Sequence, residues 1–290
     1  MPSSPASSTH NDAFAFVQEL AGALNSGKVD LPSFPDIALR VRQVLADELV
    51  PTEKVVRVLN SEPALAAQLL RIANSRALNS SGKKLTDLRT AVARMGFNMV
   101  RSAAITFAMS QLKKVEALKG LEKPLEDLWR RSAAVGAFCY VIARRQGNLN
   151  PDTALLAGVL HGIGRLYILT RSVHHPGLFA DQASFNDIVR DWSAQIAKAL
   201  LENWGMPAEI VTAVSEFEDH DRQYAGPPDL ADVLTVSALL AVFRQWPEEI
   251  EFNMEGVKAC SRLRMDRAAY EKLIAESDSE IEALRSALGM

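Results

Sequence analysis

An apolar stretch at residues 154–169, ALLAGVLHGIGRLYIL, is the strongest constraint on how this sequence folds. A segment this apolar has to be buried, and its length suits a helix in the core of a large helical domain. It is shorter than the ~20 residues that a membrane-spanning helix needs. His161 interrupts the stretch, together with Gly162 and Gly164. A histidine in such a position has either a structural or a chemical role, so its surroundings bear on function as well as on fold.

The rest of the chain indicates the same structural class. Of its 290 residues, 48% are hydrophobic and 23% are charged, as in ordinary soluble globular proteins. Helix-forming Ala, Leu, Glu and Arg dominate, and apolar residues recur at helical spacing far more often than at alternate positions. We therefore predict an all-α fold with a substantial core. Turn and capping residues place the helices at about 12–24, 36–46, 52–59, 61–73, 86–95, 98–112, 125–145, 152–169, 185–203, 207–214, 230–243 and 266–288.

The breaks between these helices suggest the domain organisation. Residues 1–11 are rich in Ser and Pro and are predicted to be disordered. Residues 12–115 form a first helical lobe, and the charged residues 113–123, which include a glycine and end before a proline, act as a hinge. A second helical lobe covers residues 125–225. A Gly-Pro-Pro sequence then opens residues 226–290, which we predict to be a C-terminal helical extension packed on the second lobe.

Cysteine usage and the N-terminus bear on the location of the protein. Cys139 and Cys260 are the two cysteines and no Cys-x-x-Cys pair is present, so neither a zinc ribbon nor a disulfide scaffold is supported. We expect both to be buried free thiols in a reducing compartment. The N-terminal residues lack the basic and apolar regions of a secretory signal. We therefore expect a cytoplasmic protein that does not span a membrane.

The net charge of −3 conceals an uneven distribution of charge along the chain. Residues 54–145 carry 17 Lys and Arg against 6 Asp and Glu, whereas residues 147–290 carry 12 Lys and Arg against 22 Asp and Glu. The basic region could attract an anionic partner such as nucleic acid, or the two regions could attract each other within one chain or between two. Because the basic residues are dispersed, we favour contacts within the protein or with a protein partner over nucleic acid.

An ordered series of short motifs runs through the first three quarters of the chain. These motifs are LPxFP, SEPAL, LLRIANS, AVxRMG, LW, AGVLHGIG and WGMP, and they begin at residues 31, 61, 69, 91, 128, 157 and 204. Each is weak alone. Together they cover about residues 31–217, and on them the sequence resembles the HDOD family, a branch of the HD superfamily found in bacterial signalling proteins. The resemblance implies an HDOD domain over residues 12–225, with an N-terminal helical lobe and a second lobe like the HD fold.

The resemblance also points to the positions at which catalytic relatives with the HD fold bind metal. In those proteins, histidines and aspartates from several helices hold a divalent ion that activates water against a phosphate ester. Carried over to this sequence, His161 is retained, but the aspartate that would follow it is Gly162. Residues other than histidine or aspartate also occupy the remaining ligand positions, which are Ser132, Ser193, Glu216 and Phe217. One imidazole does not hold a catalytic metal, so these departures imply a site with neither metal nor catalysis.

The other histidines do not rebuild such a site. His174 and His175 lie in a polar loop before a proline and are predicted to face solvent. His220 lies in an acidic segment that is typical of an exposed loop. We expect His161 to be buried and hydrogen-bonded to a backbone carbonyl or a neighbouring helix. The two glycines that follow it are expected to permit close helix packing or to end the helix.

These observations predict a non-catalytic signal-transduction or regulatory protein that needs no cofactor and acts through protein–protein interactions. The resemblance implies that its partners are other bacterial signalling proteins, with enzymes of cyclic-dinucleotide turnover and motility regulators as candidates. The oligomeric state is left open. The candidate partner-binding residues are basic side chains of the first lobe that we expect to be exposed: Arg71, Arg76, Lys83, Lys84, Arg89 and Arg101.

The sequence leaves two alternatives. One is a divergent phosphohydrolase that acts on nucleotides through a rebuilt metal site, and stoichiometric metal near His161 would reveal it. The other is a module that binds a nucleotide or a nucleic acid through the basic first lobe. Salt-dependent binding that is lost on charge reversal at Lys83, Lys84 and Arg89 would reveal this second alternative.

Overall fold

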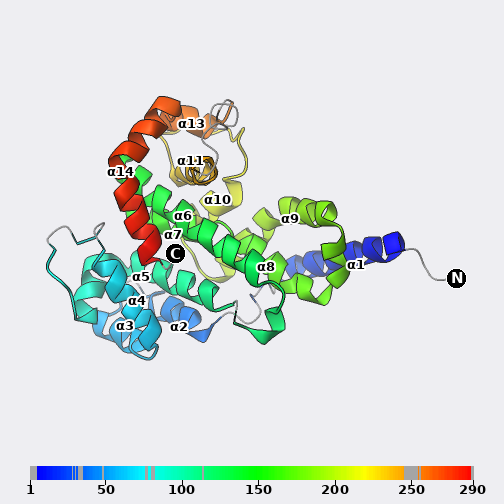
Figure 1. Ribbon diagram of the computed structural model, residues 1–290, viewed down its shortest axis with the longest axis horizontal. Helices are drawn as coiled ribbons and strands as arrows, with labels where there is room; N and C mark the ends of the chain where they lie inside the picture. The colour runs from blue at the N-terminus through cyan, green and yellow to red at the C-terminus, as the bar shows by residue number, and fades with distance from the viewer. Residues whose placement is uncertain are drawn as a thin grey trace.

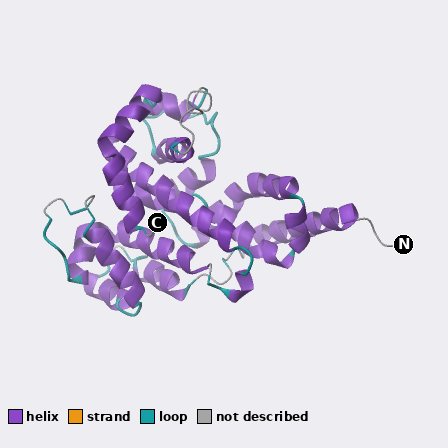
Figure 2. Cartoon of the chain, in the orientation of Figure 1, coloured by secondary structure: helices purple, strands orange, loops and turns teal. Residues whose placement is uncertain are grey.

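The computed structural model describes residues 5–288 of the chain (Figure 1), apart from residues 28, 30, 32–34, 48, 76–77, 80–81, 113, 245–253 and 255. Every regular element within the described residues is a helix, and none is a strand (Figure 2). The predicted all-α class is confirmed. The buried apolar side chains of both lobes form one continuous core. Both cysteines are free and buried, as predicted.

The first lobe is built around one long helix. The two helices predicted at 86–95 and 98–112 form a single element with a break at Gly96, whose φ of +73° suits glycine and few other residues. Pro63 opens its helix at a position where a missing N–H costs no hydrogen bond. The lobe contains α2 (Asp36–Val44), α3 (Thr52–Leu59), α4 (Pro63–Ala73) and α5 (Leu88–Leu112), and the first three pack against α5.

The second lobe depends on a close contact between its first two helices. A Cβ atom added to Gly158 of α7 would lie 2.5 Å from the Cα atom of Gly136 in α6, so the two backbones approach more closely than any other residue type allows. The helices of this lobe are α6 (Glu122–Gln146), α7 (Pro151–Leu160), α8 (Ile163–Arg171), α9 (Gln182–Asn203) and α10 (Ala208–Glu216), with the short 3₁₀ helices η1 (Glu116–Leu118), η2 (Ser172–His174) and η3 (Pro176–Ala180).

Asn150 caps α7. Its side-chain oxygen accepts hydrogen bonds from the backbone N–H groups of Asp152 and Thr153, at 2.9 and 3.0 Å. The helix begins at Pro151, one residue before the predicted start at about residue 152. Pro151 occupies the first helical position, which proline favours, so the cap falls on the residue before it.

Residues 151–174 are the one stretch in the described part of the chain that is long and apolar enough to cross a membrane, by length and composition alone. In the fold, 94% of the apolar window in this stretch is buried. α5 and α6 pack against α7, and α9 packs against α8. The stretch therefore has the surroundings of core helices, as predicted for residues 154–169.

Helix α1 (Pro5–Asn25) begins earlier than predicted. Residues 5–11, which we expected to be disordered, are helical. The buried Phe16 anchors the helix, and a helix that is already anchored extends at little cost per residue. Asp12 Oδ2 accepts a hydrogen bond at 3.1 Å from the backbone N–H of Gly177. This contact holds α1 against the rest of the protein.

α1 packs on η3 and α9 of the second lobe (Figure 1), although we had assigned residues 12–115 to the first lobe. His175 lies against this helix. Its Nε2 atom is 3.1 Å from Glu19 Oε2, and its ring centroid is 5.1 Å from that of Phe16. The prediction that His175 faces solvent was therefore wrong, because it could not anticipate the packing of α1. His174 is exposed, as predicted.

The C-terminal helices are integrated into the core. α11 (Leu230–Phe243) packs on α6, α7 and α10, and α13 (Lys258–Leu263) packs on α11. α14 (Arg267–Ala287) runs along α6 and reaches α4 (Figure 1). There Gln68 Nε2 donates a buried hydrogen bond to the carbonyl oxygen of Leu288 at 3.1 Å. The C-terminal helices thus pack on the second lobe, as expected, and α14 in addition reaches the first.

Part of the charge asymmetry is used within the chain. The basic end of α6 meets the acidic side of α14, where Arg145 Nη2 lies 3.0 Å from Glu276 Oε2 and Arg144 pairs with Glu280. The basic and acidic regions of the sequence therefore attract each other across this interface.

Candidate functional site

Most of the predicted metal-ligand positions meet at one cavity of the second lobe. Gly162 at the start of α8, Ser193 of α9 and Phe217 at the end of α10 line it together with His161. Ser132 of α6 lies behind Gly162, because a Cβ atom added at position 162 would be 3.3 Å from the Ser132 Oγ atom. The cavity has a volume of about 570 Å³, with the open space at its mouth included. We call it the HD cavity.

His161 is buried at the HD cavity, with 8% of its surface exposed. Its Nδ1 atom lies 2.7 Å from the carbonyl oxygen of Gly158, so the predicted hydrogen bond to a backbone carbonyl is present. A carbonyl oxygen can only accept, so Nδ1 carries the hydrogen and Nε2 keeps its lone pair. The ring also meets that of Phe217 edge-on, at a centroid distance of 5.6 Å. Burial, reinforced by the charge of Arg131, lowers the pKa of His161 to about 4, and the imidazole is neutral near pH 7.

This lowered pKa predicts a measurable sensitivity to acid. His161 takes up a proton with a pKa of about 6.5 in the unfolded chain but about 4 in the folded protein. Between these values the unfolded chain binds more protons, so the contribution of His161 to stability is complete above about pH 6.5 and falls as the pH drops toward 4. Urea unfolding at pH 7 and at pH 4.5 measures this contribution. Between these two pH values, the free energy of unfolding of the wild type should fall by about 2–3 kcal/mol more than that of His161→Gln.

The exposed His174→Gln is the matched control for this measurement and should keep the wild-type dependence on pH. If wild type and His161→Gln lost the same free energy of unfolding between the two pH values, His161 would not be held neutral by burial.

The glycines that follow His161 are tightly packed. A Cβ atom added to Gly162 would lie 2.7 Å from the Cδ1 atom of Leu128, so this leucine occupies space that an aspartate at position 162 would need. At Gly164 an added Cβ atom would lie 2.0 Å from the carbonyl oxygen of Ser193. α8 therefore packs directly on the backbone of α9. The close helix packing that we predicted at these glycines is confirmed.

The side chains at the HD cavity do not fit a divalent metal. The described residues contain no group of three or more His, Cys, Asp or Glu that could hold an ion. Of these residue types, the HD cavity has His161 and Glu218 among its described lining. A catalytic divalent metal such as zinc takes about three protein ligands and keeps an open position for water or substrate. The donor set of this chain falls short of that requirement.

Two arginines that the sequence prediction missed also line the HD cavity. Arg165 of α8 lies one helical turn after His161, a spacing that puts the two side chains on one face and could have revealed it. Arg131 of α6 carries no comparable signal. Its neighbour Arg130 belongs to a surface ion pair with Asp127 at 2.8 Å, and the sequence does not distinguish one arginine from the other.

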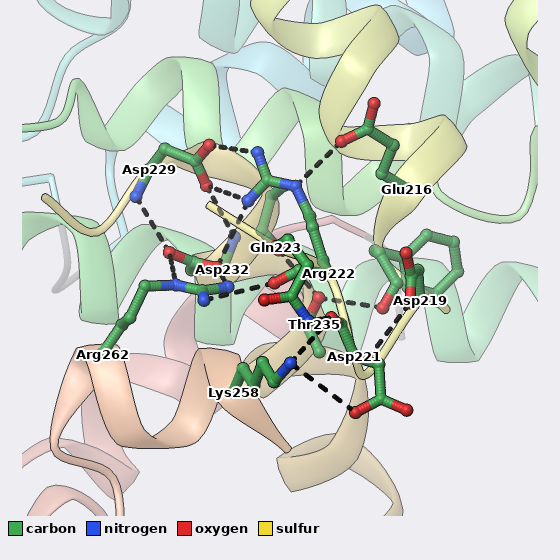
Figure 3. A network of polar contacts seen from close by, with 12 residues as sticks. Glu216, Asp219, Asp221, Arg222, Gln223, Asp229, Asp232, Thr235, Lys258 and Arg262 are labelled. Carbon is green, nitrogen blue, oxygen red and sulfur yellow. Dashed lines mark hydrogen bonds and ion pairs between the residues drawn. The ribbon is translucent and has the colours of Figure 1, made fainter. Parts of the chain in front are cut away.

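A network of ion pairs fixes the segment that follows α10 (Figure 3). The guanidinium of Arg222 donates to Glu216 at 2.8 Å and to both oxygens of Asp229 at 2.5 and 3.0 Å. Asp232, which is 1% exposed, accepts from Arg262 Nε at 2.8 Å and lies 3.4 Å from Arg222. Glu216, one of the predicted ligand positions, is thus bound to Arg222 and is not part of the HD cavity lining.

α11 holds the next part of the cavity wall. Thr235 Oγ1 lies 2.8 Å from the carbonyl oxygen of Phe217 and 2.9 Å from that of Ala231, and its hydroxyl hydrogen is shared between them, which helps to hold Phe217 beside His161. Glu218 and His220, which follow in the chain, are exposed, as predicted for this acidic segment.

Most candidate partner-binding residues of the first lobe that the structure describes are exposed. Arg71 lies on α4, and Lys83 and Lys84 lie in the segment between α4 and α5. Arg89 is also exposed, but it forms an ion pair with Glu53 of α3. Arg71, Lys83 and Lys84 are therefore the better candidates for contact with a partner.

Arg101 differs from the rest of this group. It is half-buried between α5 and α2, where its guanidinium donates to the carbonyl oxygen of Leu45 and, at 2.7 Å, to Asn98 Oδ1. The expectation that Arg101 is exposed was wrong, because α2 folds over it. Arg76 lies outside the described residues.

Comparison with a protein family agrees with this architecture. A model described as the HDOD domain matches residues 31–220, which include every residue that lines the HD cavity. The chain belongs to the HDOD domain family. The matched residues of this HDOD protein contain α2 to α10 and the whole described lining of the HD cavity.

Two solved structures are similar in fold. A Shewanella amazonensis SB2B protein, provisionally named a metal-dependent phosphohydrolase, is 23% identical with a TM-score of 0.75, over 96% of this chain and 99% of its own. A Marinobacter aquaeolei VT8 protein, provisionally named a signal transduction protein, is 21% identical with a TM-score of 0.59, over 96% of this chain and 67% of its own. At these identities the likeness shows the fold alone.

A curated relative is longer than this chain. It is an uncharacterized protein of Treponema pallidum (strain Nichols), 22% identical over a 213-residue alignment that covers 68% of this chain. The match covers 39% of that relative's length. This chain therefore spans only part of the length of that relative.

Proposed function

We propose that this HDOD protein is a non-catalytic signalling component that acts by binding other proteins. The observation that carries the proposal is the donor set of the HD cavity, where the aligned ligand positions supply one histidine and no aspartate. That histidine, His161, already donates its Nδ1 hydrogen to Gly158, and Leu128 fills the space beside Gly162. Its described residues keep a helical framework like that of the HD superfamily without the group of donors that such metal chemistry needs.

The names of the two similar structures differ, one being a phosphohydrolase and the other a signal transduction protein. For this chain, the side chains of the HD cavity favour a role in signal transduction over phosphate-ester hydrolysis. We place its action in the cytoplasm, with enzymes of cyclic-dinucleotide turnover and motility regulators as candidate partners. Arg71, Lys83 and Lys84 offer exposed positive charge for an acidic protein surface. Affinity capture followed by reconstitution with the purified partner tests this part of the proposal.

Metal content and hydrolysis test the absence of catalysis. Protein purified from cells supplied with Mn, Fe, Ni and Mg should hold much less than one equivalent of each metal, because the HD cavity has too few ligands. It should also leave nucleotide phosphodiesters intact. His161→Gln is the matched control, and its metal content should equal that of the wild type. Stoichiometric metal in the wild type that His161→Gln loses would establish the divergent phosphohydrolase instead.

A further inference from the structure

The HD cavity carries more positive charge than the fold explains. Arg131 and Arg165 both line it, and within the described residues neither guanidinium forms an ion pair with a carboxylate. By contrast, Arg130, the next residue on α6, pairs with Asp127 at 2.8 Å. Glu218 is the one carboxylate among the described lining residues. Burial and the charge of Arg165 lower the pKa of Arg131, and Glu218 opposes them less strongly.

Arg131 and Arg165 are both exposed, so water weakens the repulsion between their guanidiniums but leaves both groups accessible to a ligand. An anion between them would remove the remaining repulsion. Guanidinium groups present several N–H donors in a planar fork, which matches the oxygens of a phosphate group two at a time. Arg131 and Arg165, which line the same cavity, are therefore suited to bind one phosphate group between them.

Hydroxyl groups at the same place supply an independent observation. Ser193 Oγ at the cavity wall and Ser132 Oγ behind Gly162 are buried and lack a hydrogen-bond partner in the described part of the protein. Ser132 is 1% exposed. Buried hydroxyls in folded proteins nearly always have a partner, so an unpaired pair beside one cavity points to a missing group. α8 also begins here, with Gly162 as an N-cap that has no side chain to cap the first turn.

We propose that the HD cavity binds the phosphate group of a small phosphorylated molecule, without a metal ion. The guanidiniums of Arg131 and Arg165 hold the phosphate oxygens, and the Ser193 hydroxyl donates a further hydrogen bond. The ligand is bound and released unchanged. This inference goes beyond the proposed role in protein binding and does not depend on a protein partner.

The cavity continues into space for the rest of such a molecule. An adjoining cavity of about 1240 Å³, with open space included, shares Arg131 and Arg165 with the HD cavity. Ala238, Leu239 and Val242 of α11 form an apolar part of its wall. Pockets for small molecules typically combine apolar surface with a few fixed polar groups. An organic phosphate should therefore bind more tightly than inorganic phosphate.

Calorimetric titration of the full chain in buffer with EDTA tests the proposal, with inorganic phosphate, pyrophosphate, AMP and glucose 6-phosphate as probes. The wild type should bind at least one of the organic phosphates. Arg131→Gln and Arg165→Gln should each weaken that binding about ten- to a hundredfold, because each removes charge-assisted hydrogen bonds. Arg130→Gln is the matched control, with the same change of charge on the same helix, and should leave the affinity unchanged.

Thermal unfolding without ligand separates lost binding from lost folding. Because Arg131 and Arg165 are exposed and form no ion pair within the described residues, each single variant should melt close to the temperature of the wild type while it loses affinity. The proposal is overturned if none of the four probes binds the wild type, or if Arg130→Gln weakens binding as much as Arg131→Gln. Binding that EDTA abolishes would overturn it as well, and would separately show that the protein holds a metal.

Discussion

Replacing Gly164 with alanine is expected to destabilise the protein by about 3 kcal/mol or more. The new Cβ atom would lie 2.0 Å from the carbonyl oxygen of Ser193, and this obstacle is backbone that no side-chain rotation can move. α8 would have to separate from α9, which opens the core beside His161. The loss in free energy of unfolding is measured by urea unfolding that is monitored by circular dichroism.

Gly22→Ala is the matched control for this experiment. Gly22 lies within α1, and a Cβ atom added there meets nothing within 4 Å. The substitution should stabilise the protein by up to about 1 kcal/mol, because alanine favours a helix more than glycine does. Equal unfolding midpoints for Gly164→Ala and the wild type would show that α8 and α9 are not in direct backbone contact.

Asp232→Ala is expected to cost about 3–5 kcal/mol of stability, since it removes one partner of a buried ion pair. Asp232 is 1% exposed and accepts from Arg262 at 2.8 Å (Figure 3). It also accepts from the backbone N–H of Asp229 at 3.3 Å at the start of α11. Its loss would leave Arg262 half-buried without a carboxylate and would free the segment that carries Phe217. The free energy of unfolding in urea is the measurement.

The control for this prediction is Asp278→Ala. Asp278 also binds an arginine, Arg244, at 2.7 Å, but 50% of its side chain is exposed. An exposed ion pair contributes about 0–1 kcal/mol, so this variant should unfold close to the wild type. If Asp232→Ala lowered the free energy of unfolding as little as Asp278→Ala does, the ion pairs around Asp232 would not be needed to hold α11 and the end of α10 together.

The features that the sequence predicted correctly depend on local patterns. Helix positions follow from apolar spacing and from turn residues such as Gly96, which takes the positive φ that ends a helical turn. His161 was predicted to be buried because its neighbours in the sequence are apolar. The convergence of positions 132, 162 and 193 followed from the resemblance to a family, and not from periodicity or composition.

The features that it missed depend on contacts between distant parts of the chain. His175 is covered because α1 folds over it, and Arg101 is half-buried because α2 does the same. The sequence does not distinguish Leu128 of α6 from other apolar residues. Its contact with Gly162 at the start of α8 is visible only in the fold. Arg165 could be found from its spacing after His161, but nothing in the sequence shows that Arg131 of α6 faces the same cavity. Such contacts are set by tertiary packing, which no local pattern encodes.

The contact between Gln68 and Leu288 also has a consequence for how the protein is made. These residues are 220 positions apart, so at a synthesis rate of about 5–20 residues per second the second follows the first from the ribosome after roughly 10–40 s. During that interval α4 and α6 have formed without the helix that covers them both. In a nascent chain, the surfaces of α4 and α6 that α14 later covers are therefore exposed. Chaperones or an early binding partner can reach these surfaces, which are buried in the folded protein.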